Sequence, residues 1–219
     1  TKKILQSWAE NVWDTGIAFG TVAGKRGDTT VEVTTYRTEN YDPDSRKPEV
    51  EYGDSIHGDL SRRDFTVNSM ALELTGEEPE FIDPFNGLQD LAAKILRTPV
   101  RPGDSFNDDP LRMMRAARFA SQLDFEIAPE VLSSMKDLAH RISIISAERV
   151  RDEFTKIMMS SNPRVGITLL VDTGIADIVL PEIPKLRLEV DEHHHHKDVY
   201  EHSITVLEQA IELENRLDG

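Results

Sequence analysis

Most of the second half of the sequence carries the spacing of amphipathic helices, and this feature limits the fold more than any other. Apolar residues recur at steps of three and four in five stretches that Pro, Gly or Ser residues separate: 107–125, 129–142, 146–160, 162–175 and 200–217. In the first stretch, Asn107 or Asp108 can cap the helix, and Pro110 suits its first turn. The sequence therefore predicts that the chain is helical from this point onward.

The first part of the chain has a different pattern. Residues 16–37 carry alternating β-branched residues on either side of a Gly-rich turn at 24–27, which predicts two strands in a hairpin. Residues 1–16 have the spacing of an amphipathic helix and lack the apolar segment and cleavage site of a signal peptide. Residues 40–59 are rich in acids and lack periodicity, which predicts a loop. Strands followed by helices indicate the α+β class.

Composition and charge narrow the function classes. The 219 residues include no cysteine, which excludes disulfides, thiol catalysis and cysteine zinc sites, and no window is apolar enough to span a bilayer. We therefore expect a cytoplasmic protein with no membrane partner. The formal net charge of -15 argues against nonspecific polyanion binding, so an RNA partner has to meet a local basic patch. Arginines do cluster, at positions 112, 115 and 118 and again at 149 and 151.

The stretch GDLSRRDFTVNSMALEL, residues 58–74, has two readings. In the simpler one, a helix begins near Ser61 or Asp64, the arginines are a solvated surface, and an apolar stripe follows. That stripe consists of Val67, Met70, Ala71 and Leu74. In the second reading the order of the residues matters more than their charge. RRDFTVNSMAL resembles the second signature motif of the class II tRNA nucleotidyltransferase and bacterial poly(A) polymerase family, which belongs to the polymerase-β-like nucleotidyltransferase superfamily.

Three further stretches resemble motifs of the same family in the same order. DPFNGLQDL at 83–91 is similar to the third motif, with Asn86-Gly87 where the family usually has two glycines. DDPLR followed by RAARF resembles the fourth motif, usually Glu-Asp-x-x-Arg, with Asp108 in place of Glu. SAERVRDEFTKIM resembles the fifth through Glu148, Arg149 and Glu153 on a supporting helix. Four ordered motifs are jointly specific.

The resemblance implies an architecture. It implies the remainder of a polymerase-β-like nucleotidyltransferase head, built of a β-hairpin plus helices, followed by an all-helical neck and body. We expect the head at residues 1–92, the neck with the base-reading helix at 93–160, and the body with the start of a possible HD domain at 161–219.

Asp109 and Arg112 can be interpreted from their chemistry alone. On a helix, residues three apart project side by side, so these two side chains are expected to stand together. The plain alternative is an intrahelical ion pair. An acceptor beside a fork of donors also matches a Watson–Crick edge with an amino donor next to a ring-nitrogen acceptor. Adenine and cytosine have that edge, and guanine and uracil have the reverse, so such a template selects ATP and CTP.

Other site residues come from the resemblance. Arg115 and Arg118 continue the row at three-residue steps, and the family's arginines at these positions contact the incoming nucleotide. For Arg118 a position over Phe119 or a pair with an acid is an almost equal alternative. Arg63 of the second motif is expected near the sugar and phosphates, and Asp64 is included with it as a nucleotide-binding residue.

Nucleotidyl transfer also requires carboxylates that hold Mg2+. Members of the superfamily carry an Asp-x-Asp pair before the hairpin and a third acid on the next strand. Glu32, between two valines, fits the third acid and is the candidate catalytic residue. The Asp-x-Asp at 42–44 contains Pro43 and predicts a turn. We therefore expect the first two metal ligands to lie outside this chain, which would be a fragment, inactive by itself.

The histidines near the C-terminus form a second candidate site. The run at 193–196 and His202 can supply metal ligands, and this stretch resembles the lead-in to an HD domain. HD chemistry needs a His-Asp dipeptide, which the sequence lacks. A surface or capping role for His202 is the alternative.

These observations predict a template-independent RNA nucleotidyltransferase. The favoured activity is CCA addition or repair at the tRNA 3′ end, with CTP, ATP and Mg2+. One alternative is a poly(A) polymerase or A-adding enzyme of the same family, which acts on other RNA 3′ ends. A second is an RNA- or nucleotide-binding module without catalysis, and a third is an HD phosphohydrolase.

Overall fold

A computed structural model of the chain describes residues 1–16, 21–40, 49–52, 55–188 and 198–217. The chain divides into two compact units, Thr1–Arg62 and Arg63–Gly219. The domain boundaries expected at 92 and 160 stay a prediction. The histidine run at 193–196 and the Asp-x-Asp at 42–44 lie outside the described residues. Among the described helices, none combines the length and apolar character that crossing a membrane requires.

The N-terminal unit is built on a three-stranded antiparallel sheet in the order β1-β2-β3. Its elements are α1 (Lys2–Trp8), β1 (Asn11–Gly16), β2 (Thr21–Arg26), β3 (Thr29–Thr34), β4 (Arg37–Asn40), β5 (Glu49–Tyr52) and α2 (Ile56–Ser61). The predicted hairpin is confirmed as β2 and β3. Its turn is shorter than the predicted 24–27, because β2 continues through Arg26, and it lies at Gly27, whose φ of 55° suits glycine. Gly24 lies inside β2, where an added Cβ would stand 3.0 Å from the Ala9 side chain. β4 and β5 pair separately.

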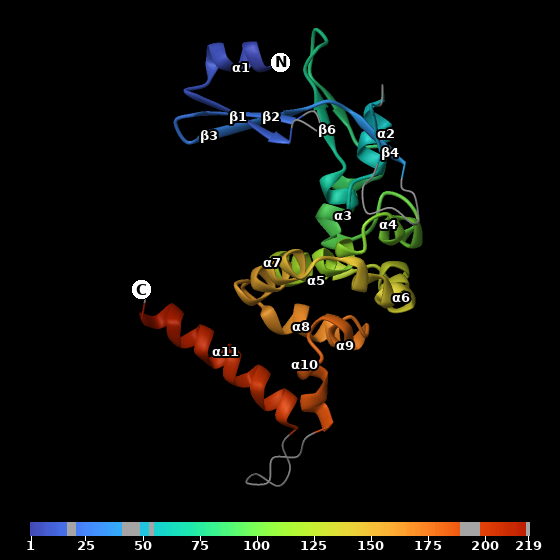
Figure 1. Cartoon of the computed structure of the whole chain (residues 1–219), viewed down its shortest axis with the longest axis vertical. Coiled ribbons are helices and arrows are strands. Elements are labelled where there is room, and N and C mark those ends of the chain that lie inside the picture. The colour runs from blue at the N-terminus through green and yellow to red at the C-terminus, as the bar shows by residue number, and fades with distance from the viewer. Residues whose placement is uncertain (17–20, 41–48, 53–54, 189–197, 218–219) are drawn as a thin grey trace. The chain divides into compact units, whose positions relative to one another are not determined.

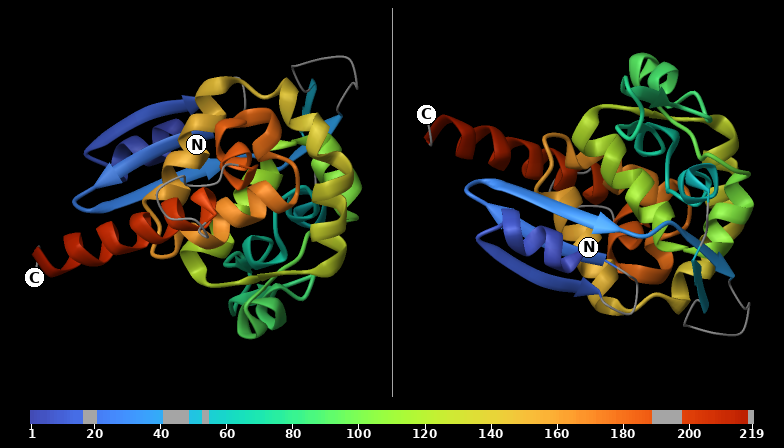
Figure 2. Two further views of the ribbon diagram at one scale, coloured as in Figure 1. Left: turned by 90° about the horizontal axis from the view of Figure 1, so that it is seen from below. Right: turned by 90° about the horizontal axis from the view of Figure 1, so that it is seen from above.

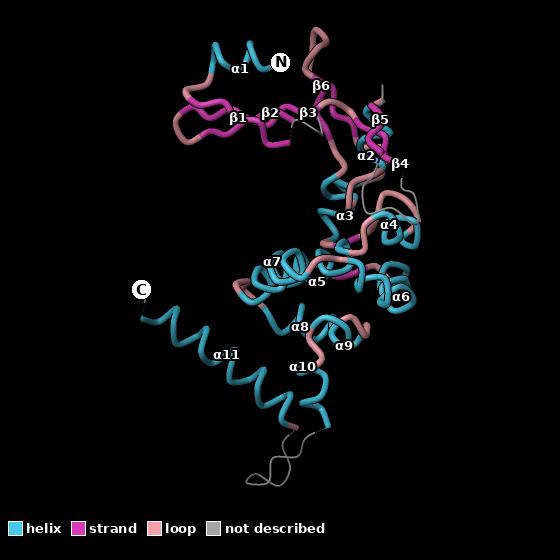
Figure 3. The backbone as a smooth tube through the Cα atoms, viewed as in Figure 1, coloured by secondary structure: helices cyan, strands magenta, loops and turns pink. Residues whose placement is uncertain are grey.

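The C-terminal unit begins with short elements that lead into helices, as the secondary-structure colouring of Figure 3 shows. The short elements are the 3-10 turn η2 (Thr66–Asn68), the paired strands β6 (Ala71–Glu73) and β7 (Glu80–Ile82), α3 (Gly87–Ala93), and β8 (Ile95–Leu96). The helices are α4 (Pro102–Asp108), α5 (Leu111–Leu123), α6 (Pro129–Leu138), η3 (Ala139–Ile144), α7 (Ala147–Met158), α8 (Pro163–Asp172), α9 (Ala176–Val179), α10 (Glu182–Lys185), η4 (Leu186–Leu188) and α11 (Val199–Leu217). The strand β9 (Glu126–Ile127) pairs in parallel with β8.

The helical stretches predicted from periodicity between residues 107 and 217 are confirmed. Of residues 1–16, predicted to be one helix, only Lys2–Trp8 is helical, and Asn11–Gly16 forms β1. The loop predicted at 40–59 is also wrong in part, because β5 and the start of α2 lie within it.

The helix expected from residues 61–64 to 74 is wrong. α2 ends at Ser61, a single 3-10 turn follows at 66–68, and residues 71–73 form β6, which pairs with β7. The reason is a set of contacts with residues distant in sequence. The backbone N–H of Thr66 donates to the carbonyl of Arg97, and the Asp64 carboxylate accepts from Nε of Arg115. A continuous helix cannot make these contacts.

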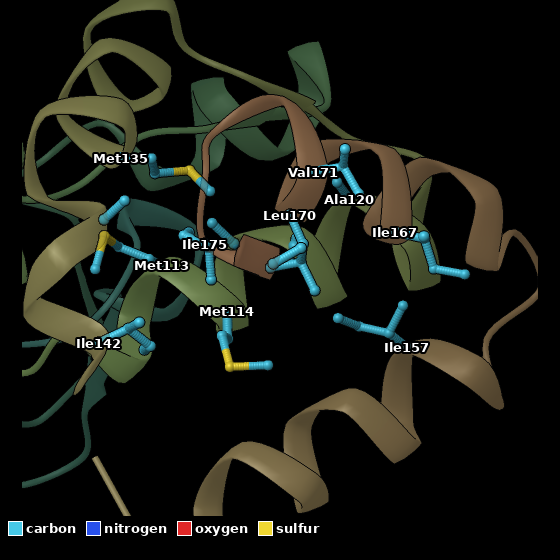
Figure 4. Packing of buried hydrophobic residues seen from close by; sticks show 14 of the residues in the cluster. Met113, Met114, Ala120, Met135, Ile142, Ile157, Ile167, Leu170, Val171 and Ile175 are labelled. Atoms are coloured by element: carbon cyan, nitrogen blue, oxygen red, sulfur yellow. The ribbon is translucent and has the colours of Figure 1, made fainter. Parts of the chain in front are cut away.

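α5 is the centre of the core of this unit. Six apolar side chains on it are buried, Leu111, Met113, Met114, Ala116, Ala117 and Ala120. In Figure 1, α7 and α8 lie beside α5, and Figure 4 shows side chains of the three helices packed together. Three alanines on one stretch of α5 allow close approach, and the glycine that faces it on α8 is Gly166. A Cβ added to Gly166 would stand 2.4 Å from the Ser121 hydroxyl and 2.7 Å from Ile157, so α8 packs closely against its neighbours at this glycine.

α11 is held to α8 and η4 through both polar and apolar contacts. Arg164 of α8 donates two hydrogen bonds to Glu208, at 2.6 and 2.8 Å, and one to Glu201, at 2.8 Å. These partners raise the pKa of Arg164. Tyr200, 1% exposed, lies under the guanidinium of Arg187. In both views of Figure 2 the C-terminal end of α11 stands apart from the other helices of its unit.

Candidate functional site

A polar cavity of about 420 Å3 in the C-terminal unit brings together residues from three distant stretches of sequence. Its lining consists of Arg63, Asp64, Asn68, Asp109, Arg112, Arg115 and Arg149. Four arginines face two aspartates there, so the cavity is locally positive although the chain as a whole carries a formal net charge of -15. Such a cavity favours an anionic ligand.

Asp64 is a buried residue in one wall of the cavity. Its Oδ2 accepts hydrogen bonds from Nε and an Nη of Arg115, at 2.8 and 2.5 Å, and its Oδ1 accepts from the Asn68 amide at 3.1 Å and from the Phe65 N–H at 2.9 Å. Burial by itself opposes ionisation, but the charge of Arg115 and these hydrogen bonds outweigh it and lower the pKa of Asp64. Asp64 therefore fixes the guanidinium of Arg115 toward the cavity.

Asp109 and Arg112 both line this cavity, but not in the way that helical spacing predicts. Asp109 has extended backbone angles, φ -141° and ψ 99°, and lies between α4 and α5. The prediction that Asp109 and Arg112 project side by side from one helix is therefore wrong. Its Oδ1 accepts from the Leu111 N–H at 3.1 Å, which satisfies a free donor at the start of α5. The cap expected from Asn107 or Asp108 is thus supplied by Asp109, because α4 continues through Asp108.

The side chain of Arg112 is held in place by Ser105. Its side chain is 8% exposed, and one Nη donates to the hydroxyl of Ser105 at 2.9 Å and to the carbonyl of Ser105 at 3.3 Å. These bonds fix the guanidinium of Arg112, which lines the cavity. An acidic acceptor and a fork of donors therefore line one cavity.

Arg118 does not line the cavity. Its Nε lies 2.9 Å from Glu153 of α7, and its guanidinium lies over the Phe119 ring at 4.3 Å. Burial lowers the pKa of Arg118, and the charge of Glu153 works in the opposite direction. The structure thus shows both contacts of the alternative expected for this residue, the aromatic ring and the acid. Its role toward a nucleotide stays a prediction.

Glu32 belongs to the N-terminal unit. It lies on β3 opposite Ala23 and is exposed. The described residues contain no group of three or more His, Cys, Asp or Glu that could hold a metal ion, so by themselves they do not fit a magnesium site. His202 is exposed on α11, and its role stays a prediction.

Asn68 and Arg149 line the cavity, although the sequence did not predict either of them as a nucleotide-site residue. Asn68 stands four residues after Asp64 and orients its carboxylate. Arg149 reaches the cavity from α7 and donates to Oδ2 of Asp109 at 3.0 Å. The Arg of the fifth motif was a signal for Arg149, but forty residues separate it from Asp109, and only the packing of α7 on α5 joins them.

The turn at residues 83–91 supports the wall that Asp64 belongs to. Asn86 takes a left-handed conformation with φ 59°, as expected for the residue that replaces a glycine. Both oxygens of Asp83 accept backbone N–H groups at the start of α3, from Gly87 and Leu88. A Cβ on Gly87 would stand 2.2 Å from the Thr66 carbonyl, and Asp90 accepts from the Thr66 hydroxyl at 2.7 Å. The turn therefore packs directly against the 64–68 segment.

Two protein families match the chain. Residues 1–97 match the family described as the poly(A) polymerase head domain, and residues 124–186 match the one described as the probable RNA and SrmB-binding site of polymerase A. The cavity residues Arg63 and Asp64 fall within the first match, and Arg149 falls within the second.

Two curated relatives of the chain are named CCA-adding enzymes. The chain is 39% identical over 175 residues to the CCA-adding enzyme of Ligilactobacillus salivarius, which covers 80% of this chain and 42% of the relative. It is 44% identical over 160 residues to the CCA-adding enzyme of Streptococcus uberis, which covers 73% of this chain and 39% of the relative. The chain thus spans about two fifths of the length of these relatives.

Solved structures give the same result. The CCA-adding enzyme of Bacillus stearothermophilus in complex with CTP matches with a TM-score of 0.66 and 34% identity, over 77% of this chain and 40% of that one. A tRNA nucleotidyltransferase complexed with a primer tRNA and an incoming ATP analogue matches with a TM-score of 0.67 and 25% identity, over 94% and 61%.

Proposed function

The chain belongs to the family of CCA-adding enzymes and poly(A) polymerases, and from this premise we propose that it supplies the nucleotide-selecting part of a template-independent RNA nucleotidyltransferase. The favoured activity is addition or repair of CCA at tRNA 3′ ends with CTP and ATP. The observation that carries the proposal is the single cavity lined by both Asp109 and Arg112.

In this mechanism the protein replaces a template base. Asp109 accepts a hydrogen bond from the amino group of cytosine or adenine, and Arg112 donates to the ring nitrogen beside it. Uracil and guanine present a carbonyl to the carboxylate and an N–H to the guanidinium, which leaves buried groups facing like groups. Such a mismatch costs more binding free energy than a matched hydrogen bond gains, so the site is expected to select mainly by rejecting uracil and guanine.

Arg63 and Arg115 are proposed to bind the sugar and triphosphate. Both line the cavity, and the two bonds from Arg115 to Asp64 fix its guanidinium in place before a ligand arrives. Preorganised donors lose little entropy on binding. Asp64 then acts through Arg115, because its two oxygens already accept from four donors.

The reaction itself is proposed to be an in-line attack of an RNA 3′-hydroxyl on the α-phosphate of the nucleotide. Dependence on Mg2+, with Glu32 as one of the acids, stays a prediction for a protein of the relatives' full length, because the described residues do not fit a metal site alone. The cytoplasmic location expected from the sequence also stays a prediction.

RNA is the proposed partner of the helical part. The match to an RNA-binding region over 124–186 supports this, as does the relative solved with a primer tRNA. Poly(A) addition remains the alternative within the family.

The decisive experiment uses a protein that carries this chain at the relatives' full length. It is incubated with tRNA that ends before CCA and, separately, with an unstructured RNA, together with labelled CTP or ATP. Incorporation of CTP into the tRNA supports CCA addition. Long tails of ATP on either RNA support poly(A) polymerase, and no incorporation at all contradicts both.

For the chain by itself, a nucleotide-binding module is a second candidate, and the missing metal group among the described residues favours it. The 219-residue chain should bind CTP and ATP without transferring them. Turnover by this chain alone contradicts the placement of the carboxylates elsewhere.

A further inference from the structure

Arg149 enters the cavity from a helix that the base-reading pair does not belong to. It lies on α7, beside α5 in Figure 1, and its Nη donates to Oδ2 of Asp109 at 3.0 Å. Its side chain is 52% exposed, and that of Asp109 is 26% exposed. An ion pair this exposed contributes little to folding, so its position in the cavity calls for another explanation.

Arg149 and the backbone together hold the Asp109 carboxylate at both oxygens. Oδ1 accepts the Leu111 N–H at 3.1 Å, and Oδ2 accepts Arg149. Two fixed points determine the plane of a carboxylate, which otherwise turns freely about its last bond. A carboxylate has about four acceptor positions, so each oxygen keeps the capacity to accept a further donor.

We propose that Arg149 is a positioning residue for base selection, which aims the Asp109 carboxylate at the amino group of an incoming cytosine or adenine. This inference rests on the proposed function. The same ion pair holds one Nη of Arg149 on Asp109 rather than toward the carbonyl of uracil or guanine. Arg149 therefore strengthens the matched bases and gives no help to the mismatched ones.

The experiment measures the affinity of the 219-residue chain for CTP, ATP, UTP and GTP by isothermal titration calorimetry. The variants are Arg149→Ala, Arg149→Lys, Asp109→Ala and the double variant. Arg151→Ala is the matched control, because Arg151 lies on the same helix, is 72% exposed and pairs only weakly with its neighbour Asp152 at 3.2 Å. Thermal unfolding of each variant reports on folding.

We expect Arg149→Ala to weaken CTP and ATP about fivefold, the scale of an exposed ion pair, and to leave UTP and GTP within about twofold. Arg149→Lys should restore part of the loss, because an ammonium group can still reach one oxygen. On an Asp109→Ala background, loss of Arg149 should change little, because the two residues act as one unit. Arg151→Ala should match the unaltered chain.

The outcomes separate this inference from the proposed function. If Asp109→Ala weakens CTP and ATP but Arg149→Ala does not, the proposed function stands and this inference fails. The inference also fails if Arg149→Ala weakens all four nucleotides equally, which indicates a phosphate contact, or strengthens CTP and ATP, which indicates a competitor. If the unaltered chain shows no preference for CTP and ATP, the proposed function fails as well.

Discussion

Arg115 donates two hydrogen bonds to a single oxygen of Asp64, a residue fifty-one positions earlier in the chain. The pair joins the segment around the 3-10 turn η2 to α5. One buried carboxylate thus connects the stability of the C-terminal unit with the shape of its cavity.

Asp64→Asn tests this connection. The substitution keeps the shape and removes the charge, which leaves the guanidinium of Arg115 without its counter-ion. We expect the free energy of unfolding to fall by about 2 kcal/mol, below the full cost of breaking a buried pair because Arg115 is partly exposed. Urea titration measures the change. Asp124→Asn is the control, since Asp124 is 84% exposed and lies 3.6 Å from Lys94; it should change the stability by less than about 0.5 kcal/mol.

Lowering the pH should remove the stability that the ionised Asp64 carboxylate contributes. Because the pKa of Asp64 is lower in the folded protein than its ordinary value of 3.8, the folded state holds this carboxylate ionised more strongly than the unfolded chain does. Its stabilising effect is complete above the unfolded pKa and disappears as the pH falls through the folded pKa. The difference in stability between the unaltered chain and Asp64→Asn should therefore narrow below about pH 4. A difference that stays constant down to about pH 2 contradicts the assignment.

Asp109→Asn should relax base selection. An amide can offer either its carbonyl or its NH2 group, so the variant can pair with both kinds of base edge. We expect the preference for CTP and ATP over UTP and GTP to fall by about tenfold, measured as a ratio of dissociation constants. Asp137→Asn, an exposed position on α6, serves as the control and should keep the ratio. An unchanged ratio in Asp109→Asn removes the basis for a protein template.

Gly87→Ala should disturb the cavity from outside it. The new Cβ would stand 2.2 Å from the Thr66 carbonyl, so the 64–68 segment has to move. We expect a loss of about 1 to 3 kcal/mol in unfolding free energy together with weaker nucleotide binding. Gly103→Ala at the start of α4 has its nearest neighbour at 3.8 Å and should be neutral or slightly stabilising. If Gly87→Ala and Gly103→Ala have the same free energy of unfolding, the prediction is wrong.

Arg118→Ala should affect folding more than binding. Glu153 is 4% exposed, and loss of Arg118 leaves it with Lys156 at 2.9 Å as the remaining cationic neighbour that the structure shows. We expect a loss of about 1 to 3 kcal/mol in stability and dissociation constants for CTP and ATP within about twofold. A large loss of affinity in a variant of normal stability favours the direct contact expected from the family resemblance.

The sequence predicts the helices of the second half well because the apolar faces that pack in the core repeat at steps of three and four along the chain. It fails at residues 61–74, where Thr66 bonds to Arg97 and Asp64 pairs with Arg115, contacts that no local pattern contains. The sequence places Asp109 and Arg112 side by side on one helix, whereas in the structure Asp109 lies before α5, accepts a bond from the Leu111 N–H and meets Arg112 only as a lining residue of the same cavity. Arg149 joins the cavity only through packing between helices, which periodicity cannot register.

The close contact at Gly166 bears on how the proposed site would accept bases of different size. The Ser121 hydroxyl and Ile157 lie against the place where a side chain of residue 166 would stand, so α8 packs closely on α5 there. Any shift of the helix that carries Arg112 and Arg115 would have to disturb this packing. Under the proposed function, a purine and a pyrimidine would therefore be accommodated by movements of individual side chains in the cavity rather than by a movement of α5.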